Sequence, residues 1–208
     1  MNAKELMQVS PIVPVIAIEN VEDALPLAKA LSEGGINIME ITLRTDAALE
    51  SIRIISEKFP SMNVGAGTVC NSDDLIKAKD AGAQFVFSPG ISKELIDAAK
   101  RHDITLIPGV STASEVMLAQ NNELYYCKLF PAMLSGGVDI LKAFQGPFAK
   151  MYFCPTGGVS LNNMNQFLSL TNVLCVGGTW IVPKDEINEG NYYTITKLCN
   201  AALESIKR

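Results

Sequence analysis

The sequence predicts an α/β fold: a single-domain (β/α)₈ barrel of the TIM type over residues 1–208, with a short N-terminal helix. Apolar runs typical of strands alternate with helical patterns along the whole chain. Strands that are each followed by a helix pair in parallel, because parallel strands need a crossover connection. Eight such units, about 26 residues each, are the number that closes a barrel. Short connections leave no room for a second domain.

The eight predicted strands share an apolar character and are each followed by a segment with helical periodicity. The predicted strands are 11–18, 36–43, 62–69, 83–90, 104–110, 125–132, 150–158 and 172–180. The apolar residues on one face of the first long helix are Ala24, Leu27, Ala28 and Leu31. After the last strand we expect a linker and then a final helix near residues 189–206.

Composition excludes several function classes. The chain has a formal net charge of −5 and no block of Lys or Arg, which argues against nucleic-acid binding. No apolar run approaches the roughly 18 residues of a membrane span, and the first residues lack a signal-peptide pattern. Five widely spaced cysteines predict reduced thiols in a cytoplasmic protein. His102 is the only histidine, which excludes histidine triads and multi-histidine metal sites.

Lys128 is the most informative single residue. It lies in the apolar and aromatic run YYCKLFPA, where strand alternation places Tyr126, Lys128 and Phe130 on one face. A lysine inside a barrel strand is costly unless it is paired or neutralised. One interpretation is a lysine at a strand edge with its ammonium in solvent. The other is a desolvated amine that attacks a keto group and forms an imine.

The segment INIMEITLRT carries two further candidates on one strand face. Glu40 is either part of a structural ion pair with a lysine on a nearby strand or a proton shuttle for imine chemistry. Arg44, at the strand end, is either an exposed loop residue or the partner of a substrate carboxylate. The two are about 13 Å apart along an ideal strand, so we expect them to contact different parts of one ligand. Thr68, at the end of VGAGT, either adds a hydroxyl and a main-chain N–H near the same carboxylate or belongs to a Gly-rich turn that only fits the barrel rim.

Two glycine pairs lie at the ends of the last two predicted strands. The residues concerned are Thr156, Gly157 and Gly158 in PTGG, and Gly178 and Thr179 after Val176 and Gly177. Many barrels bind phosphate with main-chain N–H groups at these two positions, although either pair alone is also a common turn. Pro89 and Pro108, in SPG and PGV, are expected to shape the pocket floor or rim, with Pro89 counted among the substrate-binding residues.

The motifs EITLRT, VGAGTV, FSPG, LIPGVST, KLFPA with GGV, GPF, FCPTGG and GGTW with VP occur in this order from about residue 11 to residue 183. Together they resemble the family of 2-keto-3-deoxy-6-phosphogluconate (KDPG) and 4-hydroxy-2-oxoglutarate (KHG) aldolases. The resemblance implies a class I aldolase without metal or cofactor, usually a homotrimer. Its substrate would be KDPG, cleaved to pyruvate and glyceraldehyde 3-phosphate, and in many relatives also KHG, cleaved to pyruvate and glyoxylate.

The resemblance also implies roles for single residues. Lys128 falls on the Schiff-base lysine and Glu40 on the acid/base glutamate of the family. Arg44 and Thr68 fall on residues that bind the pyruvyl carboxylate. Thr156 falls on the threonine linked to facial selection of the aldehyde. The glycines of PTGG, with Gly178 and Thr179, fall where the phosphate is expected.

The sequence departs from the family pattern at two places. Met133 and Leu134 follow KLFPA where many relatives have Glu or Gly, which can alter the trimer contact or the site rim. Ala17, with Glu19 nearby, stands where some relatives have a phosphate-binding arginine. Three alternatives stay open: an aldolase for the galactonate epimer, a non-catalytic phosphate-binding barrel, and a metal-dependent aldolase, which the single histidine disfavours.

Overall fold

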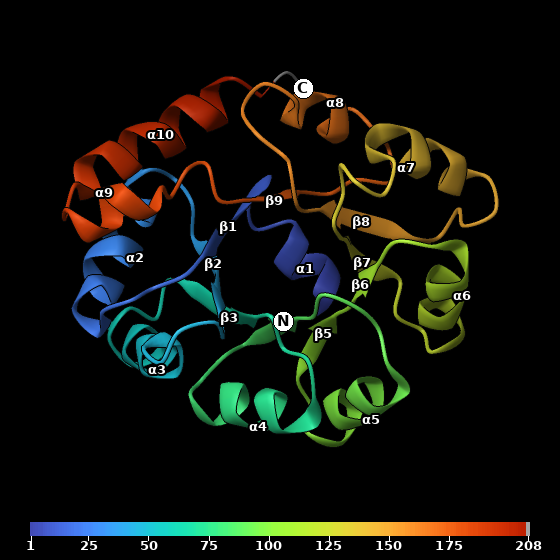
Figure 1. Cartoon of the computed structure of the whole chain (residues 1–208), viewed down its shortest axis with the longest axis horizontal. Coiled ribbons are helices and arrows are strands. Elements are labelled where there is room, and N and C mark those ends of the chain that lie inside the picture. Colours follow the sequence, from blue (N-terminus) through green and yellow to red (C-terminus); the bar gives the residue numbers. More distant parts are fainter. Residues whose placement is uncertain (207–208) are drawn as a thin grey trace.

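The computed structural model describes residues 1–206. Parallel strands curl around a common centre, and helices surround them on the outside (Figure 1). The strands are β1 Ile12–Ile16, β2 Ile38–Thr42, β3 Asn63–Gly67, β4 Phe85–Phe87, β5 Thr105–Ile107, β6 Gly109–Val110, β7 Tyr126–Leu129, β8 Tyr152–Pro155 and β9 Val176–Gly178. Every strand pairing is parallel, as the alternating sequence pattern predicts. The chain therefore has an α/β fold with a curled parallel sheet.

The strands form two sheets that adjoin each other. One has the order β5-β4-β3-β2-β1-β9 and the other the order β6-β7-β8. The predicted strand 104–110 is divided into β5 and β6 at Pro108, which has no N–H for the ladder. The carbonyl of Pro108 still accepts a hydrogen bond from the backbone N–H of Lys128 (2.8 Å). At the other junction, parallel bridges link Phe153 to Val173 and Thr156 to Gly177.

The helices connect successive strands. They are α1 Ala3–Met7, α2 Ala24–Glu33, α3 Ala48–Lys58, α4 Ser72–Asp80, α5 Lys93–Arg101, α6 Ala113–Asn121, α7 Gly137–Gln145, α8 Met164–Leu168, α9 Lys184–Asn188 and α10 Tyr192–Glu204, with a short 3₁₀ turn, Val21–Asp23, before α2. The predicted N-terminal helix is confirmed as α1. The predicted linker before the final helix was wrong in part, because α9 forms within it and α10 begins only at Tyr192.

Side-chain caps start several of these helices. The side chains of Asn71, Ser92 and Thr112 accept hydrogen bonds from backbone N–H groups in the first turns of α4, α5 and α6. At α6 the carboxylate of Glu115 completes a capping box with Thr112. Because these caps satisfy N–H groups that have no partner within the helix, they place the helix starts directly after the loops that follow the strands.

The hydrophobic core fills the space between the strands and the helices. The predicted face of α2, formed by Ala24, Leu27, Ala28 and Leu31, is fully buried against it. In the view of Figure 1, α1 lies across the inside of the strand ring, with Leu6 and Met7 buried. The hydroxyl of Thr105 donates a hydrogen bond to the carbonyl of Met1, which ties the N-terminus to β5 (2.9 Å). Among residues 1–206, no helix has the length and apolar character needed to cross a membrane.

Tyr192, at the start of α10, gives a prediction for stability. Its hydroxyl donates a 2.7 Å hydrogen bond to Asp23, and burial, with this contact, raises the pKa of Tyr192 to about 12. We expect Tyr192→Phe to lower the free energy of unfolding at pH 7 by about 1 kcal/mol in urea titrations. The stability that the neutral phenol provides is complete below about pH 10, the ordinary pKa of tyrosine, and is lost as the pH rises through about 12.

The control for this prediction is Tyr193→Phe, because Tyr193 is 72% exposed. This variant should unfold like the wild type. Equal loss of stability above pH 10 in the wild type and in Tyr192→Phe would contradict the assignment.

Candidate active site

Lys128 and Glu40 face each other on the inner side of the curled strands. The Lys128 Nζ lies 3.0 Å from Glu40 Oε1 and 3.4 Å from Oε2. Both side chains are buried, with exposed fractions of 6% and 1%. The interpretation of Lys128 as a strand-edge residue with its ammonium in solvent was therefore wrong. Glu40 does form an ion pair with a lysine on another strand, and that lysine is Lys128 itself.

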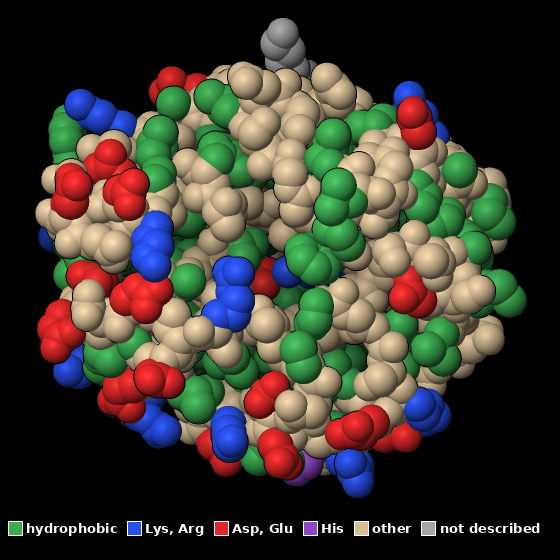
Figure 2. Space-filling model, in the orientation of Figure 1, with side chains coloured by type: hydrophobic (Ala, Val, Ile, Leu, Met, Phe, Trp, Pro, Cys, Tyr) green, Lys and Arg blue, Asp and Glu red, His purple; other side chains and the backbone are tan. Residues whose placement is uncertain are grey.

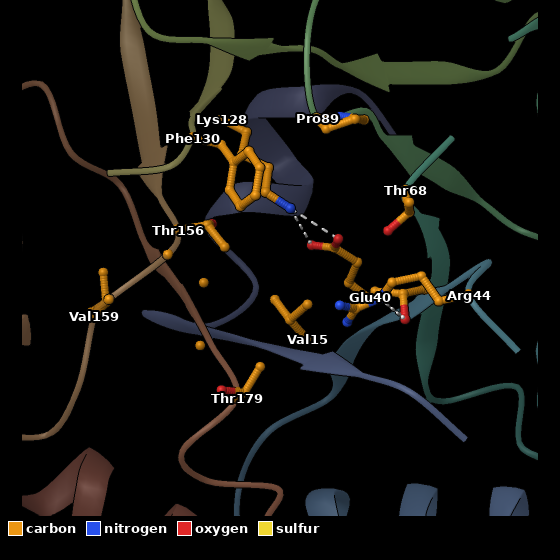
Figure 3. Close-up of a pocket in the computed structure, with 15 residues that line it drawn as sticks. Val15, Glu40, Arg44, Thr68, Pro89, Lys128, Phe130, Thr156, Val159 and Thr179 are labelled. Carbon is orange, nitrogen blue, oxygen red and sulfur yellow. Dashed lines mark hydrogen bonds and ion pairs between the residues drawn. The ribbon is translucent and has the colours of Figure 1, made fainter. Parts of the chain in front are cut away.

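Apolar rings enclose the Lys128 amine. Its Nζ lies 5.3 Å from the ring centres of both Phe87 and Phe130. Figure 3 shows Phe130 beside Lys128, with the Glu40 carboxylate pointing toward the amine from the opposite side. The amine is thus enclosed by apolar rings and has a carboxylate, a possible proton acceptor, within hydrogen-bond distance. The arrangement suits a nucleophilic amine with a carboxylate base.

Strand alternation and register explain why these two side chains meet. Lys128 is paired with Gly109 on β6 and with Cys154 on β8, and Glu40 with Val15 on β1 and Gly65 on β3. Every second residue of each strand points to the inner side of the curled sheet. Gly67, on the neighbouring strand β3, leaves space for the Glu40 carboxylate.

Thr42 and Arg44 extend the site along the same strand face. The Thr42 hydroxyl donates a hydrogen bond to the carbonyl of Ile16 (2.9 Å) and accepts one from Arg44 Nε (3.1 Å). This chain of contacts holds the Arg44 guanidinium at the strand end. Arg44 and Glu40 line the same cavity, as the spacing of the two residues predicts.

Thr68 has a backbone conformation that is rare for its residue type. Its φ is +60°, in the left-handed region, which strains a β-branched residue. In this conformation Thr68, which directly follows β3, lies at the mouth of the cavity. Figure 3 shows it across from Lys128 and above Arg44. Strained residues of this kind cluster at ligand-binding sites.

All ten predicted site residues line one cavity of about 150 Å³. They are Glu40, Arg44, Thr68, Pro89, Lys128, Thr156, Gly157, Gly158, Gly178 and Thr179. Figure 2 shows a hollow near the centre of this face, where cationic and acidic side chains meet. The structure thus brings the candidates together at the carboxyl ends of the strands, while their individual roles stay predictions.

The PTGG and VGG segments form one wall of this cavity. Gly157 and Gly158 have φ values of +98° and +79°, which only glycine adopts without strain. A Cβ atom on Gly177 would lie 2.2 Å from the Thr156 hydroxyl, so β8 and β9 approach closely here. A Cβ atom on Gly158 would lie 2.6 Å from Met133 Cγ, which places that unusual methionine behind the wall rather than in the cavity.

Within residues 1–206, no group of three or more His, Cys, Asp or Glu side chains has an arrangement that could hold a metal ion. Burial raises the pKa values of Cys127 and Cys199, so these thiols are not nucleophiles at neutral pH.

Comparison with known proteins identifies the family. The model for the family described as "KDPG and KHG aldolase" matches residues 3–198. The chain belongs to this aldolase family. It is 48% identical to the 2-dehydro-3-deoxy-phosphogluconate aldolase of Dickeya dadantii, covering 97% of this chain and 95% of the relative. It is 47% identical to the KHG/KDPG aldolase of Escherichia coli K12, covering 99% and 97%.

A solved structure agrees with this assignment. The KDPG aldolase of Legionella pneumophila, with pyruvate captured as a covalent carbinolamine, superimposes with a TM-score of 0.96. It is 43% identical and covers 98% of each chain. The protein is thus an aldolase, a carbon–carbon lyase, and the resemblance seen in its motifs is confirmed.

Five residues that line the cavity of this aldolase were not predicted from the sequence. They are Val15, Thr42, Phe130, Val159 and Gly177. Thr42 and Phe130 could have been found, because they share strand faces with Glu40 and Lys128. Val15 and Val159 give no such signal, since apolar residues at these positions are equally typical of the core.

A substitution at Gly67 tests whether catalysis depends on the position of the Glu40 carboxylate next to the Lys128 amine. A Cβ atom on Gly67 would lie 2.1 Å from Glu40 Oε1, so Gly67→Ala must push the carboxylate away from the amine. We expect kcat to fall by about 100-fold, because a displacement of about 1 Å in a reacting group has this effect. The matched control is Gly90→Ala, where nothing lies within 4 Å of the new methyl group. Wild-type kcat in Gly67→Ala would show that this packing is not needed.

Proposed function

We propose that this aldolase cleaves KDPG to pyruvate and glyceraldehyde 3-phosphate through a Schiff base on Lys128, and that it also cleaves KHG to pyruvate and glyoxylate. The observation that carries the proposal is the buried Lys128 amine, 3.0 Å from the Glu40 carboxylate, in a cavity open to a substrate. A free amine next to a proton acceptor is what imine formation requires.

The first half of the reaction attaches the substrate. Lys128 passes a proton to Glu40, and its nitrogen attacks the C2 carbonyl carbon. Glu40 returns the proton to the C2 oxygen to form a carbinolamine. Glu40 then takes the extra proton from the nitrogen and delivers it to the C2 hydroxyl, so that water leaves and a protonated imine remains. The Phe87 and Phe130 rings next to Nζ shield the amine from bulk water and face the positive charge of the imine.

The second half breaks the carbon–carbon bond. Glu40 accepts the proton of the C4 hydroxyl, directly or through a water, and C4 becomes the aldehyde carbon. The electron pair of the C3–C4 bond moves into the imine and gives the enamine of pyruvate. Glu40 then protonates C3, and addition of water releases pyruvate and restores the amine. The imine accepts the electrons, so we expect no metal or cofactor to be required.

Arg44 and Thr68 are the proposed partners of the substrate carboxylate. Both line the cavity on the Glu40 side, and Thr42 holds the guanidinium in place. An arginine fork can bind a carboxylate through two hydrogen bonds. The proposed contacts of the distal half are Thr156 with the aldehyde and the main chain of Gly157, Gly158, Gly178 and Thr179 with the phosphate, with Pro89 on the opposite wall.

The relatives support this assignment. Their names specify KDPG or both KHG and KDPG, and the Legionella pneumophila structure holds pyruvate as a carbinolamine, the adduct expected before the imine.

We also propose that the two adjoining sheets act as one closed (β/α)₈ barrel over a single domain, 1–208, and that the aldolase is a cytoplasmic homotrimer. The parallel bridges Phe153–Val173 and Thr156–Gly177 support closure of the barrel, and the five free cysteines fit a reducing compartment such as the cytoplasm. The trimer rests on the family resemblance alone.

A pyruvate assay coupled to lactate dehydrogenase tests the function. We expect pyruvate from KDPG and KHG, slower release from the galactonate epimer, and full activity in EDTA. Faster turnover of the epimer would assign the aldolase to galactonate metabolism, and loss of activity in EDTA would favour a metal-dependent reaction. Binding of KDPG without any pyruvate release would favour a non-catalytic barrel.

A further inference from the structure

A second cavity of about 240 Å³ adjoins the active site. It is lined by Val15, Ala17, Arg44, Thr179, Val182, Pro183, Lys184 and Ile187. Three of these residues, Val15, Arg44 and Thr179, also line the active-site cavity, so the two spaces meet at this rim. A ligand that extends past Thr179 from Lys128 therefore enters the second cavity.

Lys184 stands at this second cavity in an ion pair with Glu19. The Lys184 Nζ lies 2.9 Å from Glu19 Oε1. The pair joins the segments that follow β9 and β1, two strands that are themselves neighbours through Pro14 and Gly178. The side chains are 61% and 43% exposed, and a pair this exposed contributes little to stability. Lys184 can therefore exchange its partner at small cost.

Of the charged side chains around the two cavities, one cation has no role yet in binding or catalysis, and it can bind a second anionic group of the substrate. Among the described residues that line them, the charged side chains are Glu40, Arg44, Lys128 and Lys184. Glu40 balances Lys128, and Arg44 serves the substrate carboxylate in the proposed function. The phosphate monoester at the far end of KDPG carries about −1.5 to −2 charges at neutral pH, more than one carboxylate. Lys184 is the remaining cation.

We propose that Lys184 binds the phosphate of the substrate from the second cavity, and that Glu19 competes with the phosphate for it. The inference rests on the proposed function for the identity of the substrate. Backbone amides of the glycine pairs supply hydrogen bonds, and Lys184 supplies the charge that separates phosphorylated from unphosphorylated substrates. Glu19 holds Lys184 at the rim when no phosphate is present and weakens binding by repulsion when it is.

Steady-state kinetics test the proposal with KDPG and the same six-carbon acid without its phosphate. In Lys184→Gln we expect kcat/KM for KDPG to fall about tenfold, mainly through KM, while the unphosphorylated acid changes less than about twofold. Lys184→Arg should restore most of the loss. In Glu19→Gln we expect kcat/KM for KDPG to rise about threefold. Equal effects on both substrates, or no effect on either, would overturn the proposal.

The matched control is Lys29→Gln. Lys29 forms an exposed ion pair with Glu33 on α2, so the variant removes the same charge from a similar pair away from the cavities. It should behave like the wild type. A tenfold loss for KDPG in this control as well would show that net charge, rather than Lys184 itself, determines phosphate affinity.

Calorimetry with glycerol 3-phosphate gives a readout that does not depend on catalysis. We expect its Kd to rise about tenfold in Lys184→Gln and to stay unchanged in Lys29→Gln, with no binding of glycerol. If glycerol 3-phosphate depends on Lys184 but no variant releases pyruvate, the phosphate site stands and the proposed function fails. If pyruvate is released normally and the Kd is the same in Lys184→Gln, the function stands and this inference fails.

Discussion

Lys128→Ala is expected to abolish cleavage, lowering kcat/KM by about 10⁴-fold or more, because the nucleophile that forms the imine is gone. The coupled pyruvate assay measures this loss. Borohydride with pyruvate should add the mass of one reduced pyruvate adduct to the wild type and none to the variant. Peptide mapping should place that adduct on Lys128. An adduct of the same yield in Lys128→Ala would show that another amine is the nucleophile.

The fold must be checked in this variant, because the substitution leaves the buried Glu40 carboxylate without its partner. Breaking a buried ion pair costs about 3–5 kcal/mol. Lys128→Met, which keeps most of the side-chain volume, and a double variant with Glu40→Gln, which removes the unpaired charge, should both fold and both remain inactive. Lys142→Ala is the matched control, since Lys142 is an exposed lysine on α7.

Glu40→Gln has the second largest expected effect. The amide keeps the shape of the side chain but cannot accept the lysine proton or return it to the carbinolamine. We expect kcat to fall by about 10²–10⁴-fold, the usual contribution of a general acid–base group. Rapid-quench trapping with borohydride should show that the pyruvate adduct still forms on Lys128, but more slowly.

Two further variants separate proton transfer from packing. Glu40→Asp keeps the carboxylate but shortens its reach, so it should retain more activity than Glu40→Gln. Glu50→Gln removes an exposed carboxylate that pairs with Arg53 on α3 and should leave kcat unchanged. If Glu40→Gln trapped the adduct and released pyruvate at wild-type rates, Glu40 would be only the structural partner of Lys128.

Strand alternation made much of the site predictable. The order of strands and helices and the inward faces at Glu40 and Lys128 follow from patterns within a few residues of each position, and the structure agrees with them. Strand ends were less predictable. The segment 83–90 was predicted as a strand, but the ladder covers only Phe85–Phe87 before the chain turns at Pro89. Inter-strand hydrogen bonds decide where a ladder ends, and they depend on neighbours that are far apart in the sequence.

The sequence itself determined the family and the chemical groups of the site, because the order of the motifs and the residue types can be read without the three-dimensional structure. Only the tertiary structure decided the distances. Lys128 and Glu40 are 88 positions apart, and Lys184 and Glu19 are 165 apart, yet each pair is in contact. Sheet register, the space left by Gly67 and the pairing of β1 with β9 set these contacts, and such long-range packing leaves no local periodicity in the chain.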